Sequence, residues 1–147
     1  MSDKPNNITE VYPRIFVSDG PTAGNLQLIQ SLGITGIVNA ALEFDYKYPS
    51  PIQLCRCGLH DEFPGCQENT DNQLMWAVTC FVRMRQEGKI VLSHCKAGHN
   101  RSGAIVVGGL VEMGVFPNVF EAYGRIAAER ELHIQPKLLK HLSRLYQ

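Results

Sequence analysis

The fold is decided by one stretch in the second half of the chain, which reads Ile90-Val91-Leu92-Ser93-His94-Cys95-Lys96-Ala97-Gly98-His99-Asn100-Arg101-Ser102. Its first residues are apolar and largely β-branched, which is typical of a buried strand. A polar segment follows, and further apolar residues then recur at helical spacing, namely Ile105, Val106, Leu110 and Val111. The stretch therefore predicts a strand, a short loop and a helix in direct succession.

The junction between this strand and this helix is a favourable place for a reactive cysteine. A thiolate at Cys95 would face backbone N–H groups and the positive end of the helix dipole, conditions that lower a cysteine pKa from about 8.5 to roughly 3.5–7.5. The same N–H groups can bind a phosphate dianion. The spacing to Arg101 allows the loop to wrap around one phosphoryl group and return a bidentate guanidinium over it. Cys95 is therefore the candidate nucleophile and Arg101 the candidate phosphate clamp.

The other residues of the segment have supporting tasks. Gly98 permits backbone torsions and a close approach that a side chain would obstruct. Ser102 is placed to donate its hydroxyl to the cysteine sulfur, and His94 is expected to orient the loop and tune the thiol. The expected phosphate-binding residues are Lys96, Ala97, Gly98, His99, Asn100 and Arg101.

A general acid has to come from another segment, because the loop itself is occupied in holding the phosphate. We predict Asp61, which lies in the irregular segment 60–69 just after a predicted strand. Glu62, Glu68 and Asp71 compete for this role. Asp71 is explained more simply as an acidic residue in the first turn of a helix, and the other two as solvated loop charges.

The remaining elements alternate along the chain. Further strands are expected at 14–18, 34–41 and 52–59. One helix is expected from Asp19 to Gly33, a second after a capping box at Thr70 and Gln73, and two more after residue 114. This order predicts an α/β fold with a central, mostly parallel, twisted sheet of about four to five strands flanked by helices. Residues 1–10 are expected to be flexible, and residues 11–147 to form a single domain.

Composition excludes several classes of protein. Lys and Arg total 14 and Asp and Glu total 14, so no global field would attract long nucleic acid or an acidic membrane surface. The sequence contains no run of about 18 apolar residues, and its N-terminus is polar, which argues against a transmembrane helix or a signal peptide. We therefore expect a cytoplasmic monomer without a metal or cofactor.

Five cysteines without a Cys-x-x-Cys pair argue for reduced thiols rather than disulfides or a zinc site. Cys55 and Cys57 fit one face of a strand. A low-pKa thiolate at Cys95 is easily oxidised, and Cys57 and Cys80 are candidates for trapping it as a disulfide. The simpler interpretation is that both are small core residues.

His94, Cys95, Gly98, Arg101 and Ser102 together resemble the signature of the protein tyrosine phosphatase superfamily: His-Cys, five residues, Arg, then a hydroxyl residue. The rest of the chain resembles the small dual-specificity members. This resemblance implies a thiophosphate intermediate, no metal, phosphotyrosine and phosphoserine or phosphothreonine substrates in proteins, and a shallow pocket. It also implies that Asn39 braces the phosphate loop.

Three alternatives stay open on the sequence. Lys96 with Ala97 and Gly98 resembles the phosphate loop of phosphoinositide phosphatases, although His99 replaces the second lysine of that pattern. Asn100 and Arg101 also resemble RNA 5′-triphosphatases of the superfamily. The third alternative is a phosphate-binding module without catalysis. Tyr46 and Tyr48 are interpreted either as rim residues of the pocket or as surface packing.

Overall fold

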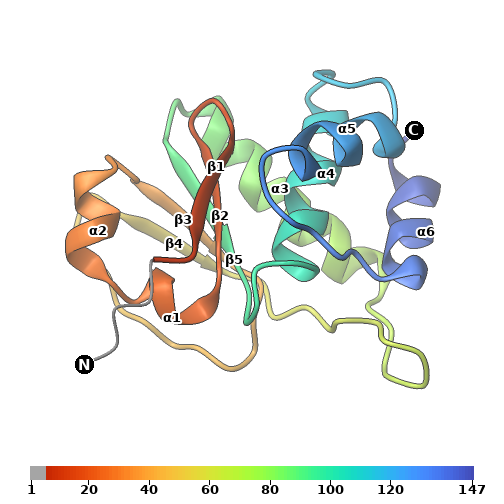
Figure 1. The fold of residues 1–147 in the computed structure, drawn as a ribbon, viewed down its shortest axis with the longest axis horizontal. Helices are drawn as coiled ribbons and strands as arrows, with labels where there is room; N and C mark the ends of the chain where they lie inside the picture. The colour runs from red at the N-terminus through yellow and green to blue at the C-terminus, as the bar shows by residue number, and fades with distance from the viewer. Residues whose placement is uncertain (1–5) are drawn as a thin grey trace.

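The structure is a computed structural model that describes residues 6–147. Its centre is a five-stranded sheet in the order β1-β2-β5-β3-β4 (Figure 1). The strands are β1 (Ile8–Tyr12), β2 (Ile15–Ser18), β3 (Gly36–Asn39), β4 (Gln53–Arg56) and β5 (Val91–His94). β1 and β2 form an antiparallel hairpin, and the other neighbouring strands are parallel. The prediction of a mostly parallel α/β sheet is confirmed.

Helices cover both faces of this sheet. They are α1 (Gly20–Ala23), α2 (Leu26–Ser31), α3 (Asp71–Gln86), α4 (Arg101–Glu112), α5 (Val119–Ala127) and α6 (Pro136–Leu145). α1 and α2 lie on one side, and α3 to α6 gather on the other (Figure 1). Strand residues alternate between the two cores: Ile37 and Leu92 pack with α2, whereas Val38 and Val91 face the larger helix layer.

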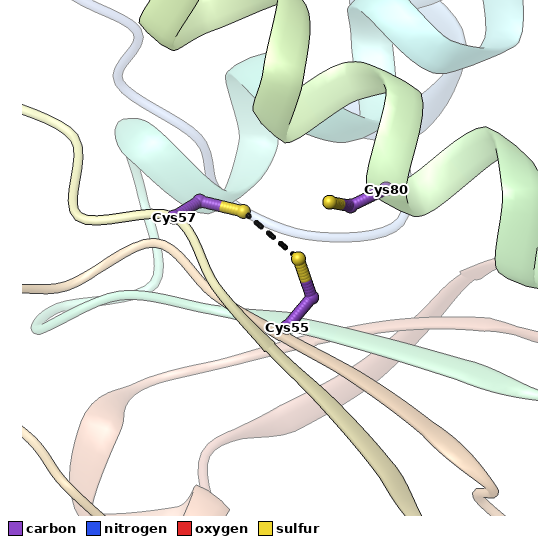
Figure 2. A group of neighbouring side chains, drawn as sticks. All are labelled: Cys55, Cys57 and Cys80. Carbon is purple, nitrogen blue, oxygen red and sulfur yellow. Dashed lines mark hydrogen bonds between the residues drawn. The ribbon is translucent and has the colours of Figure 1, made fainter.

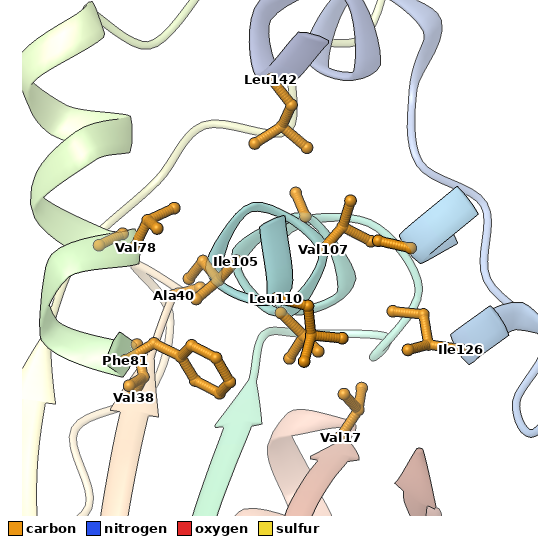
Figure 3. Packing of buried hydrophobic residues seen from close by; sticks show 14 of the residues in the cluster. Val17, Val38, Ala40, Val78, Phe81, Ile105, Val107, Leu110, Ile126 and Leu142 are labelled. Atoms are coloured by element: carbon orange, nitrogen blue, oxygen red, sulfur yellow. The ribbon is translucent and has the colours of Figure 1, made fainter. Parts of the chain in front are cut away.

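Helix α4 lies in the middle of that larger layer. Side chains from β2, β3, α3, α5 and α6 surround it, among them Val17, Val38, Phe81, Ile126 and Leu142 (Figure 3). Every residue from Arg101 to Val111 is buried. Because the helix is packed on all sides, its N-terminal end is held firmly at the carboxyl edge of the parallel strands.

Two sequence expectations need correction. Residues 8–10 are not flexible, because they form the start of β1 and pair with β2 in the register Ile8 to Ser18; residues 1–5 lie outside the described residues. The single helix expected between Asp19 and Gly33 is two helices. Each has its own N-cap, since Asp19 accepts a hydrogen bond from the Thr22 amide and Asn25 accepts one from Leu28.

The helix start at Thr70 is confirmed. The Thr70 hydroxyl accepts from the Gln73 amide at 3.1 Å, and the Gln73 side chain accepts from the Thr70 amide at 2.7 Å, which is the complete capping box. This cap ends the irregular segment that carries Asp61. Among the helices of residues 6–147, none combines the length and the apolar character needed to cross a membrane.

Candidate active site

Cys95 follows β5 directly and precedes α4, at the carboxyl edge of the parallel strands, where open α/β sheets bind ligands. The residue is 2% exposed. Its Sγ lies 3.2 Å from the Ser102 Oγ and accepts a hydrogen bond from the Gly98 amide at 3.3 Å. The structure thus brings Cys95, Gly98 and Ser102 together as the sequence predicts, with an amide and a hydroxyl within hydrogen-bonding distance of the sulfur.

The loop needs glycine at position 98. Gly98 has a φ of +76°, and a Cβ on it would lie 2.8 Å from the backbone carbon and oxygen of Ser18. The Gly98 carbonyl accepts a hydrogen bond from Arg130 Nε at 2.9 Å, and Arg130 Nη1 donates to the Thr9 hydroxyl at 3.1 Å. Sequence reasoning missed Arg130, because nothing around it indicates a partner 32 positions earlier.

Arg101 is buried between two carboxylates. Its Nη1 and Nη2 donate to the two carboxylate oxygens of Glu43 at 3.1 and 3.3 Å, and Nη1 also donates to the Leu59 carbonyl at 3.2 Å. Its Nε lies 3.0 Å from Asp61 Oδ1, an ion pair without the angle of a hydrogen bond. Burial of the guanidinium opposes its charge, but the hydrogen bond to Glu43 and the charge of Asp61 outweigh this and raise the pKa of Arg101.

Glu43 is a residue that sequence reasoning missed. It lies in the loop after β3, 58 positions before Arg101, and no motif marks it. The hydrogen bond from Arg101 lowers the pKa of the Glu43 carboxyl, so the side chain is an anion at neutral pH. Its two oxygens occupy the guanidinium as two oxygens of a phosphate would.

Asp61 is fastened to the phosphate loop by Asn100. The Asn100 side-chain amide donates to the Asp61 carbonyl at 2.7 Å and to its Oδ1 at 3.0 Å. The Asn100 Oδ1 accepts from the Gln135 amide at 2.8 Å. One side chain therefore joins three segments of the chain and places Asp61 beside Arg101.

The competing acidic residues point elsewhere. Glu62 is 1% exposed, and its Oε2 accepts from the Asn69 side chain at 2.7 Å and lies 3.3 Å from His141 Nδ1. Asp71 contacts His141 Nε2 at 2.6 Å and Arg144 Nη2 at 2.7 Å. Glu62, Asp71 and Glu68 all line a separate cavity of about 440 Å³ beside α6, whereas Asp61 lines the cavity at Cys95.

The cavity at Cys95 has a volume of about 350 Å³. Its lining combines the phosphate loop with residues from three other segments, namely Glu43, Asp61, Phe63, Cys95, Lys96, Ala97, His99, Asn100, Arg101, His133 and Gln135. Phe63 is 45% exposed, and the rings of His99 and His133 meet edge to face at 5.5 Å. The phosphate loop thus forms a polar base of the cavity, and aromatic and imidazole rings form part of its walls.

His94 is fully buried beneath the phosphate loop. Its ring lies edge to face against Phe44, with ring centres 6.3 Å apart, and its Nδ1 is 3.4 Å from the Cys95 carbonyl oxygen. Burial lowers the pKa of His94 from its ordinary value of 6.5 to about 4. The imidazole is therefore neutral at physiological pH, which suits an orienting role.

Asn39 differs from the expectation that it braces the phosphate loop, and the two tyrosines take one of the two positions that the sequence left open. The Asn39 side chain donates to the Phe44 carbonyl at 2.9 Å and accepts from the Ala41 amide at 2.9 Å, so it braces the loop that carries Glu43 rather than the phosphate loop. Tyr46 stacks on Phe44 at 5.6 Å, and the Tyr48 hydroxyl donates to the Ala23 carbonyl at 2.7 Å. Both tyrosines pack against the body of the protein, outside the lining of the Cys95 cavity.

Comparison with known proteins identifies the family. The model of the dual specificity phosphatase catalytic domain matches residues 15–147. The chain belongs to the dual specificity phosphatase catalytic-domain family. The resemblance predicted from His94 to Ser102 is thus confirmed, and the domain is of the cysteine-dependent phosphatase type.

Individual relatives agree with this assignment. The chain is 29% identical over 136 residues to a Slingshot protein phosphatase homolog of Xenopus laevis, and 28% identical over 101 residues to the Slingshot protein phosphatase of Drosophila melanogaster. These matches cover 91% and 67% of this chain but only 18% and 9% of the relatives. A putative dual specificity phosphatase of mouse has the same fold, with a TM-score of 0.86, 20% identity, and coverage of 100% of this chain and 91% of the mouse chain.

Proposed function

We propose that this protein hydrolyses phosphate monoesters through a thiophosphate intermediate on Cys95. The observation that carries the proposal is that Cys95, Arg101 and Asp61 line one cavity, while the buried Ser102 hydroxyl lies 3.2 Å from the Cys95 sulfur. Nucleophile, phosphate clamp and acid are the parts that phosphoryl transfer requires. Their joint presence argues against a phosphate-binding module without catalysis.

The first step transfers the phosphoryl group to sulfur. The Cys95 thiolate attacks phosphorus in line while the bond from phosphorus to the leaving oxygen breaks. Asp61 is paired with Arg101 as a carboxylate in the free protein. It takes up a proton from solvent when the phosphate dianion binds beside it, and as the carboxylic acid it gives that proton to the leaving oxygen. Arg101 and the loop amides meet the negative charge on the three equatorial oxygens.

The second step releases phosphate. Asp61, now a carboxylate, takes a proton from water as the water oxygen attacks phosphorus. The bond from sulfur to phosphorus breaks, and the Ser102 hydroxyl stabilises the departing Cys95 thiolate by a hydrogen bond. Inorganic phosphate leaves, and thiolate and carboxylic acid are restored, so protons and electrons balance.

Substrate binding requires an exchange of anions at Arg101. In this structure the guanidinium is bound to Glu43 and paired with Asp61. A phosphate dianion carries more charge than one carboxylate and also contacts the loop amides, so it displaces Glu43 from Nη1 and Nη2. Asp61 stays near its place because Asn100 holds it through both its carbonyl and its Oδ1.

The substrates that fit best are phosphotyrosine and phosphoserine or phosphothreonine in proteins. The half-exposed Phe63 and the rings of His99 and His133 offer apolar and aromatic contacts beside the phosphate site, which suits a peptide side chain. The chain carries no net charge that would attract long RNA. Lys96 is exposed and solvated, and the chain offers His99 in place of a second lysine for an inositol polyphosphate. We place the protein in the cytoplasm as a monomer.

The test compares the wild type with Cys95→Ser and the matched control Cys66→Ser, which changes an exposed cysteine outside the site. All three are assayed on phosphotyrosine and phosphoserine peptides, phosphoinositide vesicles and triphosphate-ended RNA. We expect the wild type and Cys66→Ser to turn over the peptides best, and Cys95→Ser to lose at least about 10⁴-fold in kcat. A wild type inactive on every substrate, or a Cys95→Ser variant that retains full turnover, would refute the proposal; faster turnover of vesicles or RNA than of peptides would refute the substrate class.

A further inference from the structure

Three cysteine sulfurs lie close together outside the lining of the Cys95 cavity. Cys55 lies on β4, Cys57 follows that strand, and Cys80 lies on α3 (Figure 2). The sulfur atoms of all three lie within 4.8 Å of one another, and those of Cys55 and Cys57 are 3.6 Å apart. Cys80 is 7% exposed, whereas Cys55 and Cys57 are partly accessible from solvent. The cluster is thus partly buried.

The spacing of the Cys55 and Cys57 sulfurs suits a metal ion better than a disulfide between these two residues. Zinc binds thiolate sulfur at about 2.3 Å, so two sulfurs of a tetrahedral site lie about 3.8 Å apart. The 3.6 Å between Cys55 and Cys57 is close to that edge, and Cys80 needs to move by less than about 1 Å to complete it. A disulfide within one extended Cys-x-Cys segment would have to span Cα atoms about 6.6 Å apart, at the upper end of the usual range.

We propose that Cys55, Cys57 and Cys80 form a binding site for a thiophilic, closed-shell divalent cation such as Zn²⁺. The three thiols lose their protons to solvent as three metal–sulfur bonds form, and water takes the fourth position. Thiolate ligands select this class of metal over Mg²⁺ or Ca²⁺. Arg83, one turn further along α3 than Cys80, offers a positive charge to the resulting anionic centre.

The position of the cluster indicates what a bound ion would do. Cys57 lies just before the irregular segment 58–70 that carries Asp61, and Cys80 lies in the third turn of α3, the helix that follows this segment. An ion bound to all three cysteines would link the strand region before this segment to the helix after it. It would therefore stabilise the fold and hold the loop, without taking part in the chemistry at Cys95.

The test uses the chain of residues 1–147 with the substitutions Cys66→Ser and Cys95→Ser, so that the three cluster cysteines remain and position 95 no longer carries a thiol. The protein is kept reduced with a phosphine and titrated with Cd²⁺, whose bonds to thiolate absorb in the near ultraviolet. We expect one Cd²⁺ per chain with the absorption of three thiolates, displacement of Cd²⁺ by Zn²⁺, and a higher melting temperature with either ion. Adding Cys80→Ser should weaken binding at least about tenfold and remove the rise in melting temperature.

Absence of the absorption, a signal of only two thiolates, or equal binding after Cys80→Ser would overturn the proposal. Cys80→Ser is nearly isosteric, and circular dichroism without metal checks that it folds. If it does not, Cys55→Ser at the half-exposed position carries the same test. These outcomes do not depend on phosphatase activity, so a failed metal site and a failed Proposed function are distinguishable.

Discussion

Two cysteine sites in this molecule, Cys95 and the cluster of Cys55, Cys57 and Cys80, are built in opposite ways. Cys95 receives its sulfur contacts from Gly98 and Ser102, which lie within seven positions of it in the chain. The cluster at Cys55 and Cys57 depends on Cys80, which lies on helix α3. A site made by one contiguous turn can be recognised as a sequence pattern, whereas a site made by packing a helix on a strand cannot.

The sharpest test of this contrast concerns Asp61, the member of the Cys95 site that comes from a distant segment. We expect Asp61→Asn to lower kcat about 10²- to 10³-fold for alkyl phosphate esters, because these need a proton on the leaving oxygen. Activated aryl phosphates should lose far less. Steady-state kinetics on both substrate types measure the ratio. Glu68→Gln, a change in the separate cavity, is the control.

Equal loss on both substrate types would assign the acid elsewhere. No loss on either substrate type would mean that the contiguous phosphate loop is sufficient for catalysis without Asp61. The whole Cys95 site would then be local in sequence, in contrast to the cysteine cluster.

The burial of His94 beneath the phosphate loop is tested by the pH dependence of the free energy of unfolding. The pKa of His94 is about 4 in the folded protein and 6.5 when exposed, so the unfolded chain binds an extra proton between these values. The free energy of unfolding is therefore unaffected above pH 6.5 and falls as pH drops towards 4, by about 3 kcal/mol from this group. Denaturant unfolding at pH 7 and pH 4 should show that His94→Asn loses about that much less than the wild type. The same loss in both proteins would contradict a buried, neutral His94.

The smallest effect concerns Glu43, which occupies Arg101 in this structure. Removing its charge in Glu43→Gln should lower the KM for a phosphopeptide by up to about fivefold, because the phosphate no longer competes with an anion at the guanidinium. The value of kcat should stay unchanged, and inorganic phosphate should inhibit more strongly. A higher KM would instead show that Glu43 orients Arg101 for binding.

Much of the fold could be predicted from local pattern. The apolar runs predicted the four parallel strands, and the capping box at Thr70 predicted the start of α3 correctly. β1 was missed because polar Thr9 and Glu10 interrupt it, and its order comes from backbone pairing with β2. The helix after Asp19 was drawn too long because the second cap at Asn25 was not recognised.

The candidate site likewise contains residues that local pattern predicted and residues that it did not. His94 to Ser102 identified the family, because each residue acts on its near neighbours within one loop. Glu43 and Arg130 escaped prediction, since a lone charge in a loop carries no sign of a partner 58 or 32 positions away. Asn39 was assigned the wrong loop for the same reason, because its hydrogen bonds depend on how the segment after β3 folds back.

The sequence by itself determined the chemistry: a thiol and a guanidinium at the spacing of a phosphate loop, between a strand and a helix. Only the tertiary structure decided what surrounds them, namely the two carboxylates at Arg101, the buried Arg130 below Gly98 and the meeting of Cys80 with Cys55 and Cys57. The physical reason is the range of the interactions. Backbone amides and a helix end act over one turn and follow from neighbouring residues, whereas ion pairs and thiol clusters require the sheet and helices to be packed first.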